Sequence, residues 1–476
     1  MAGPRGLVLA APHGRSGKTT VAMGVCAALA GRGLRVQPFK KGPDFIDPGW
    51  LTLAAGRSCR NLDLFMLGDE VTRRSFLGAC RGADLALVEG AMGLFDGLDP
   101  AGSNSTAQLA RLLGLPVVLL VDVTRMTRTA AAVVRGLVGF EEGIDFRGVI
   151  LNRVGTSRQE RLVRQAVEQY SGLPVLGAIP RWQGAAVPDR HLGLIPAGER
   201  LSGTRLAAEE AIAEAARAVQ AGVDLDRLLE AGAPIAAPYH ADGGEGFAGE
   251  RSGREEEEPV SIGVVRDRVF SFYYPDNLEA LERAGARLVP IDSLQDSRLP
   301  LVAALYIGGG FPEVFAHELE QNLPLRLSLR EAIAEGLPVY AECGGLMYLC
   351  RSIAWEGQGH EMVGALPFDV EMATSPRGHG YVEAKVVGES PYFPRGAVIR
   401  GHEFHHSLPT RVPAENMVFR LGRGTGWGHG CDGLMWGSVF ASYLHVHALA
   451  CPGWAPALVR EARRFDRERR GVRTWR

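Results

Sequence analysis

Cys343 is the residue best placed to act as a nucleophile. It follows an apolar run, 337–340, that we expect to be a buried strand, and precedes 346–349, which we expect to begin a helix. Gly344 and Gly345 let the backbone bend sharply at this turn, as a nucleophile elbow requires. A helix N-terminus would favour the thiolate, the reactive form of cysteine. The stretch fits a catalytic cysteine and, equally, a small buried one.

A cysteine nucleophile needs a base, and His445 is the candidate. It lies near the end of 439–447, an apolar stretch that we expect to be one strand. Only the fold could bring His445 to Cys343. A glycine run follows another expected strand, 303–306, and could offer N–H donors to an oxyanion. The donors we expect there are Gly309, Gly310 and Gly344.

A second kind of chemistry is indicated near the N-terminus. Residues 12–20 lie between an apolar run, 6–11, and a helical pattern, 21–29, which is the context of a phosphate loop. Backbone N–H groups and the helix dipole would hold the phosphates of ATP. Lys18 would reach the β and γ oxygens, and the Thr19 hydroxyl could coordinate Mg²⁺. The loop residues expected at ATP are Gly14, Gly17, Lys18, Thr19 and Thr20.

Charged residues follow two further strands in the same part of the chain. Lys40 and Lys41 end the expected strand 34–39, and Glu89 ends the expected strand 83–88. Ligands bind beyond the carboxyl ends of parallel strands, so Glu89 is the best candidate for a magnesium-ordering carboxylate. The loop after Lys41 also holds Asp44 and Asp47, which could serve phosphates, a substrate carboxylate or Mg²⁺, or could be a solvated turn.

The elements that must position these residues are those of an α/β protein. The apolar runs 117–122 and 148–153 fit a parallel sheet covered by helices on both faces, and an Ala-rich helix, 207–221, closes this part. Residues 238–258 are rich in Gly and Glu and fit a flexible linker. We therefore expect two domains, 1–237 and 259–455, followed by a basic surface tail, 456–476, that is helical at first.

Composition limits the partners. The 476 residues are 46% hydrophobic and 22% charged with a net charge of −2, which describes a soluble globular protein without the basic excess that binds nucleic acid. No apolar run is long enough to span a membrane. Seven cysteines without a C-x-x-C pair argue against disulfides or structural zinc and favour the cytoplasm. No signal peptide is recognisable at the N-terminus.

The cysteine turn, the glycine run and the strand-end histidine resemble a class I glutamine amidotransferase domain. In that family a Glu two residues after the histidine orients it, whereas this chain has His447 there, so the third member of the triad is open. Fusion of such a domain to an ATP-binding one implies a particular reaction. ATP converts a carboxylate into an acyl phosphate, and ammonia from glutamine displaces the phosphate to form an amide.

Five stretches, 39–48, 88–97, 306–313, 340–349 and 400–405, resemble the cobyrinate or hydrogenobyrinate a,c-diamide synthase family in the same order. The N-terminal domain of that family is similar to dethiobiotin synthetase. By this resemblance Thr19, Glu89 and Asp44 or Asp47 bind Mg²⁺, Lys40 and Lys41 lie at the phosphates or substrate, and Asn152 lies at the adenine. The implied reaction is glutamine- and ATP-dependent amidation of a corrin, a tetrapyrrole, in cobalamin synthesis.

Other interpretations of the chain stay open. Amidation of the same two acetates, a and c, on a sirohydrochlorin-type tetrapyrrole stays open, because the Lys40-Lys41 pair and the run 49–51 after Pro48 differ from the plainest corrin enzymes. A cobyric acid synthase would amidate other positions on the ring. A partitioning-type ATPase fused to an inactive amidotransferase-like module would have no amidating activity. A homodimer is possible in each case.

Overall fold

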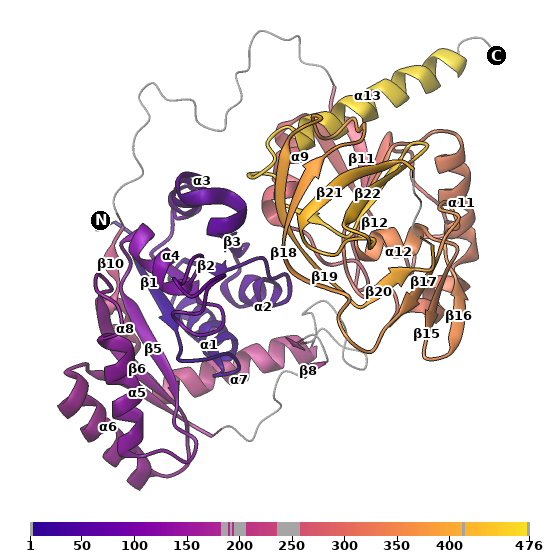
Figure 1. Ribbon diagram of the computed structural model, residues 1–476. Coiled ribbons are helices and arrows are strands. Elements are labelled where there is room, and N and C mark those ends of the chain that lie inside the picture. Colours follow the sequence, from indigo (N-terminus) through magenta and orange to yellow (C-terminus); the bar gives the residue numbers. More distant parts are fainter. Residues whose placement is uncertain are drawn as a thin grey trace, which may run out of the picture. The chain divides into compact units, whose positions relative to one another are not determined.

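The computed structural model describes residues 3–181, 189–190, 193–194, 206–235, 258–411 and 415–473. The chain divides into two compact units, Met1–Phe247 and Ala248–Arg476, each with its own large sheet (Figure 1). The division falls inside the expected linker 238–258, nearly all of which lies outside the described residues. Within the described ranges, no helix combines the length and the apolar character needed to cross a membrane.

The first unit is built on an eight-stranded sheet. Its strand order is β3-β2-β4-β1-β5-β6-β7, all parallel, with β10 added antiparallel to β1. A further short pair, Asp189–Arg190 (β8) with Gly193–Leu194 (β9), is separate from it. The strands are β1 (Arg5–Ala10), β2 (Val36–Lys41), β3 (Arg60–Leu62), β4 (Leu85–Glu89), β5 (Val117–Asp122), β6 (Phe146–Val154), β7 (Val175–Pro180) and β10 (Ala233–Pro234).

Helices cover both faces of this sheet, as the apolar strands predicted. Because successive side chains of a strand point to opposite faces, Leu7 and Leu9 pack in one core and Val8 and Ala10 in the other. The first core lies under α1 (Lys18–Gly31), α2 (Ile46–Ala55), α7 (Leu206–Gly222) and α8 (Leu225–Ala231). The second lies under α3 (Leu64–Ala79), α4 (Thr106–Leu113), α5 (Arg128–Val138) and α6 (Ser157–Ser171).

The second unit contains a ten-stranded sheet that is half parallel and half antiparallel. The parallel half is β12 (Ala286–Ile291), β11 (Val260–Val265), β13 (Ala304–Ile307), β14 (Val339–Glu342) and β23 (Val439–Ser442). The antiparallel half is β22 (Cys431–Trp436), β21 (Met417–Arg423), β18 (Gly378–Val386), β19 (Val398–His405) and β24 (His445–Val446). A smaller sheet contains β16 (Gln358–Glu361), β15 (Ser352–Trp355), β17 (Asp369–Met372) and β20 (Ser407–Pro409).

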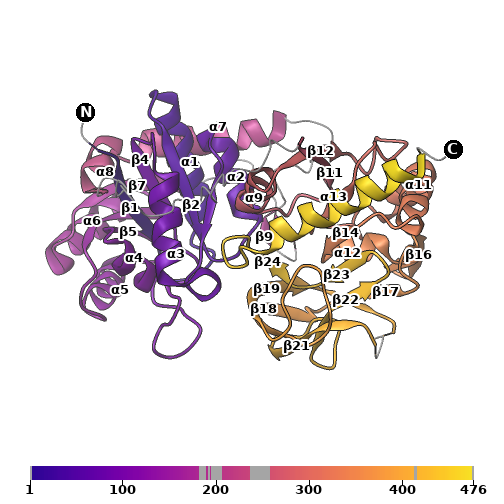
Figure 2. The same cartoon turned by 90° about the horizontal axis from the view of Figure 1, so that it is seen from above.

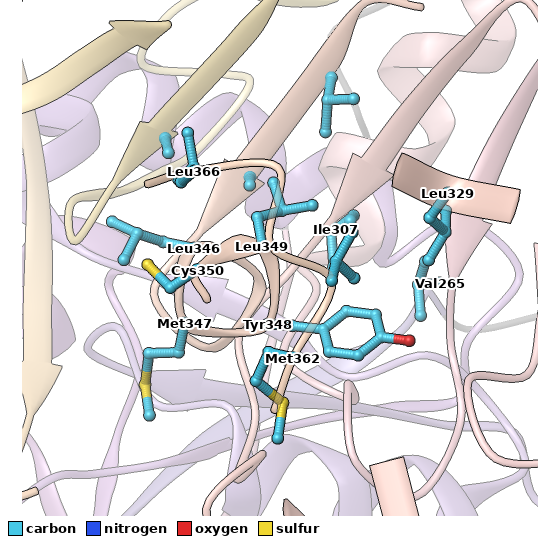
Figure 3. Packing of buried hydrophobic residues seen from close by; sticks show 14 of the residues in the cluster. Val265, Ile307, Leu329, Leu346, Met347, Tyr348, Leu349, Cys350, Met362 and Leu366 are labelled. Atoms are coloured by element: carbon cyan, nitrogen blue, oxygen red, sulfur yellow. The ribbon is translucent and has the colours of Figure 1, made fainter. Parts of the chain in front are cut away.

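Among the described residues of this unit there are five helices: α9 (Pro275–Arg283), α10 (Ala316–Gln321), α11 (Leu323–Ala334), α12 (Gly344–Leu349) and α13 (Trp454–Arg473). The short α12 is buried along its whole length. Leu346, Tyr348 and Leu349 pack with Ile307 and Val265 in one continuous core (Figure 3). This packing fixes the turn that precedes α12, which carries Cys343.

Two expectations about the second unit are wrong. The stretch 439–447 is two strands, β23 and β24, because Asp432 accepts hydrogen bonds from the N–H groups of Tyr443 and Leu444 and breaks the run there. The segment 456–476 is largely the helix α13 (Figure 2). The helix expected at the start of this segment is present, but Leu458 and Ala462 are fully buried in the core of the unit, so this part is not a surface tail.

Candidate active site

The phosphate loop of the first unit connects β1 to α1. Gly17, at the start of α1, has a φ of 88°, and a Cβ there would lie 2.6 Å from Nδ2 of Asn152. Only glycine fits without strain. Lys18 Nζ donates hydrogen bonds to the carbonyl oxygens of His13, at 3.2 Å, and Met92, at 2.7 Å. Burial lowers the pKa of Lys18 to about 8. The ammonium is therefore held against the loop, where phosphates bind in such folds.

The predicted acids and lysine of this unit form one buried cluster. Lys40, in β2, pairs in register with Glu89, the last residue of β4. Lys40 Nζ forms ion pairs with Asp47 Oδ2 and with Glu89 Oε1, the latter at 2.7 Å, and lies 3.9 Å from Asp44 Oδ2. The Thr19 hydroxyl donates to Glu89 at 2.8 Å and to Asp47 at 3.1 Å. All five predicted residues therefore meet beside the phosphate loop.

The electrostatics of the cluster are dominated by burial and mutual charge. Burial raises the pKa of Glu89. Burial alone would lower the pKa of Lys40, but the charges of Asp47, Glu89 and Asp44 outweigh it and raise that pKa. Burial would also raise the pKa of Asp47, but Lys40 outweighs it and lowers that pKa. Lys40 is therefore a fixed positive charge among carboxylates.

The same cluster has the donors that Mg²⁺ prefers. Hydroxyl and carboxylate oxygens are hard ligands suited to this ion. Glu89 Oε2 is buried and accepts no hydrogen bond from any residue that the structure describes. A buried carboxylate oxygen without a hydrogen-bond donor is stabilised when a cation binds to it. Thr19, Asp47 and Glu89 therefore fit a magnesium site, with Asp44 at its edge.

The other predicted residues of this unit lie around the loop. Asn152 Nδ2 donates to the carbonyl oxygen of Ser16 at 2.8 Å and so braces the phosphate loop; its contact with adenine stays a prediction. Gly14 lies beside Met92, and Thr20 is in the first turn of α1. Lys41 is buried, and burial lowers its pKa although Asp63 opposes the shift. Its predicted role at the phosphates is not tested by these contacts.

Cys343 lies between β14 and α12 with φ 47° and ψ −101°, a strained conformation for a residue other than glycine. Its N–H donates to the carbonyl oxygen of Ser442 at 2.8 Å, which fixes the turn to β23. Burial raises the pKa of the thiol, with the acid Glu313 as the next contribution. The N–H of Gly344, at the start of α12, lowers this pKa as expected, but burial outweighs it, so the sulfur needs a base.

His445 lies beside this turn. Its Nδ1 is 3.4 Å from Oε2 of Glu342, the residue before Cys343. A Cβ on Gly309 would lie 2.6 Å from Cε1 of His445, and a Cβ on Gly344 would lie 2.9 Å from the amide nitrogen of Gly310. The fold thus gathers the predicted nucleophile turn, the base and the three glycines. This arrangement suits acyl transfer through a thioester.

His447 has other neighbours. Its Nε2 is 3.7 Å from Oδ2 of Asp276, its ring packs on Tyr274 at 4.7 Å between centroids, and its Nδ1 accepts from the N–H of Leu449. The acid beside His445 is Glu342 instead, which the sequence analysis did not single out. Its position at the carboxyl end of β14 was the available signal, since ligands and reacting groups gather at that edge.

Together the two sites define a class: a phosphate-loop nucleotide-binding domain joined to a glutamine amidotransferase domain. Protein-family models agree. A CobQ/CobB/MinD/ParA nucleotide binding domain matches residues 7–194, and a CobB/CobQ-like glutamine amidotransferase domain matches residues 261–452.

Relatives narrow the class to one family. The chain is 44% identical to a cobyrinate a,c-diamide synthase of Magnetococcus marinus, over 97% of both chains. It is 43% identical to one of Archaeoglobus fulgidus, over 96% of this chain and 97% of that protein, and 38% identical to one of Salmonella typhimurium, over 96% and 98%. The chain belongs to the cobyrinate a,c-diamide synthase family. These findings do not favour the partitioning-type ATPase, the cobyric acid synthase or the sirohydrochlorin alternative.

Proposed function

We propose that this chain amidates the a and c acetate carboxylates of cobyrinate or hydrogenobyrinate, using ATP and glutamine, in cobalamin biosynthesis. The observation that carries the proposal is the presence, in one chain, of a phosphate-loop carboxylate cluster and a buried Cys–His turn. The names of relatives matched over nearly their whole length supply the substrate. The reaction class is that of a carbon–nitrogen ligase with glutamine as nitrogen donor.

The first unit would activate the carboxylate. Thr19, Asp47 and Glu89 would hold Mg²⁺, which neutralises charge on the β and γ phosphates during transfer. Lys18 would stabilise the γ-phosphate, and the loop N–H groups would hold the others. An oxygen of the substrate carboxylate attacks the γ-phosphorus, the bond to ADP breaks, and an acyl phosphate forms. Lys40 keeps the carboxylate cluster compact and offers positive charge to an anionic substrate.

The second unit would supply ammonia. His445 takes the proton of Cys343, and the sulfur attacks the side-chain amide carbon of glutamine. The N–H groups of Gly310 and Gly344 would face the oxyanion, and Gly309 leaves room for the imidazole. His445 returns the proton to the leaving ammonia, and water hydrolyses the glutamyl thioester. Ammonia then displaces phosphate from the acyl phosphate to give the amide.

Product analysis tests the substrate. The purified chain is given ATP, Mg²⁺ and glutamine with cobyrinate, hydrogenobyrinate and sirohydrochlorin in parallel, and amide groups are counted by mass spectrometry. We expect two amidations on a corrin. Amidation of sirohydrochlorin alone would move the reaction to another tetrapyrrole, and no amidation of any of the three would overturn the proposal.

Variants test the division of labour between the units. Cys343→Ser and His445→Ala should each abolish glutamine-dependent amidation and keep amidation supported by free ammonia. Cys431→Ser, a partly exposed cysteine of the same unit, is the matched control and should keep both. Loss of both activities in a folded Cys343→Ser protein would contradict the proposal. We further expect a cytoplasmic homodimer without nucleic-acid or membrane partners, which sedimentation and fractionation would check.

A further inference from the structure

The base of the proposed glutaminase has a buried acid beside it. Glu342 and His445 each have side chains about 2% exposed, and Glu342 Oε2 lies 3.4 Å from His445 Nδ1. Both residues come from strand ends of the same sheet, β14 and β24. A carboxylate buried to this degree needs hydrogen-bond partners. A histidine is a partner whose ring the carboxylate can in turn orient.

The orientation of the imidazole separates the roles of its two nitrogens. Nδ1 faces Glu342, whereas Cε1 and Nε2 face the glycine turn, with Nε2 3.3 Å from the place of a Cβ on Gly309. A carboxylate at Nδ1 selects the tautomer with a proton there and leaves the lone pair on Nε2. That lone pair lies on the side of the turn that would bind the oxyanion. The carboxylate would also stabilise the imidazolium that forms when His445 takes a proton.

Glu342 is itself held in place by two other elements. The Tyr306 hydroxyl, on β13, donates to Oε2 at 3.3 Å, and the N–H of Val446, on β24, donates to Oε1 at 3.3 Å. Asn277 Nδ2 donates to Val446 O at 2.9 Å and to the Tyr306 hydroxyl at 3.3 Å. Both carboxylate oxygens therefore have fixed donors, and the acid cannot turn away from His445 without losing them.

Other buried acids of the unit accept hydrogen bonds from other groups. Asp432 accepts from Ser442 and from the N–H groups of Tyr443 and Leu444. Glu403 accepts from the N–H groups of Thr425 and Gly426. The ring of His447 packs on Tyr274 and faces Asp276, so the residue two places after the base is not aimed at it.

We propose that Glu342 is the positioning acid of this amidotransferase unit, completing a Cys343–His445–Glu342 triad from the residue before the nucleophile. The proposal rests on the proposed glutaminase function. Glu342 would touch neither glutamine nor the reacting atoms, and would act through the tautomer, orientation and charge of His445.

Glu342→Gln is the test, because it keeps the shape and removes the charge. We expect the kcat of glutamine-dependent amidation to fall by about 10²-fold, less than the ~10⁴-fold of a tightly bonded serine-protease acid, since 3.4 Å is long for a charge-assisted hydrogen bond. The KM for glutamine should stay within about twofold, because binding is not affected. Amidation supported by free ammonia should be unchanged, which also shows that the variant is folded.

Two further variants sharpen the result. Glu342→Asp retains the charge at a slightly greater distance and should recover part of the lost kcat. His447→Gln is the matched control for the family's usual acid position and should keep kcat within about twofold. Wild-type kcat in Glu342→Gln, or a larger loss in His447→Gln than in Glu342→Gln, would overturn the proposal. Absence of glutaminase in the unchanged chain would instead remove the proposed function, and the two failures are thereby distinguished.

Discussion

Replacing Gly309 by alanine should misplace the proposed base. A Cβ at residue 309 would lie 2.6 Å from Cε1 and 3.3 Å from Nε2 of His445, whereas ordinary contact begins at 3.4 Å. Either the imidazole or the backbone at Gly309 must therefore move by about 0.8 Å. Displacements of about 1 Å in a catalytic group can reduce rates about 10²-fold.

Neighbouring atoms leave little space for either the imidazole or the backbone to move. On the other side of residue 309, Phe272 Cβ would lie 3.3 Å from the new methyl, and the Phe272 N–H donates to the Gly309 carbonyl at 3.1 Å. The ring of His445 stacks on that of His402 with 4.9 Å between centroids, and its Nδ1 is hydrogen-bonded to Glu342. We expect overpacking to cost about 1–3 kcal/mol in the free energy of unfolding in addition to the loss of rate.

Glutamate release at saturating glutamine is the assay. Gly309→Ala should lower its kcat about 10²-fold and leave ammonia-dependent amidation intact. Gly359→Ala is the matched control, because Gly359 lies in β16 of the same unit and a Cβ there meets nothing within 4 Å. Wild-type kcat in Gly309→Ala would refute the placement of His445 against this glycine, and equal losses in both variants would show that the effect is not local.

Three further changes test the carboxylate cluster and the terminal helix. Glu89→Gln should lower ATP-dependent amidation by about 10²-fold or more, and retained magnesium-dependent activity would argue against Glu89 as a ligand. Lys40→Met leaves buried carboxylates without their ammonium and should lower the free energy of unfolding by about 3–5 kcal/mol, measured with denaturant in the absence of Mg²⁺. Arg35→Met is the control, because it removes an exposed ion pair with Asp84 and should change this free energy little. Leu458→Ala should cost about 2–5 kcal/mol in the same assay because the side chain is fully buried, and a change near zero would restore the surface-tail interpretation.

The first unit could be predicted in detail because its signals are local. The central strands β1, β4 and β5 are largely apolar runs, and the phosphate loop follows the first of them. Since the carboxyl ends of parallel strands share one edge, residues that end different strands must be neighbours. That rule alone brings Lys40 and Glu89 together, and the structure pairs them in register. Asp47 follows because its helix, α2, begins after only a short loop, 42–45, beyond the end of β2.

Much of the second unit could not be predicted because its order comes from distant contacts. The antiparallel half of its sheet pairs β19 with β24 and β18 with β21, and such pairings are set by partners far apart in the chain. Helix α13 is a different case. Its helical start was expected, but its basic residues suggested a solvated surface. Trp454, Leu458 and Ala462 recur every four residues and form its buried stripe. That period was a usable signal of a buried helix face.

The acid of the proposed triad shows why the family's spacing, a Glu two residues after the histidine, is a poorer guide than the geometry of the site. Orienting a histidine requires a carboxylate at Nδ1 and a fixed tautomer, and any strand that reaches that point can supply it. His447 meets Tyr274 and Asp276 at its own place in the chain, so a glutamate there would lie beside another acid. Glu342 reaches Nδ1 from the end of β14, the strand that stops directly before Cys343. The nucleophile and the acid that orients its base would thus be positioned by one strand, and any distortion of β14 would disturb both.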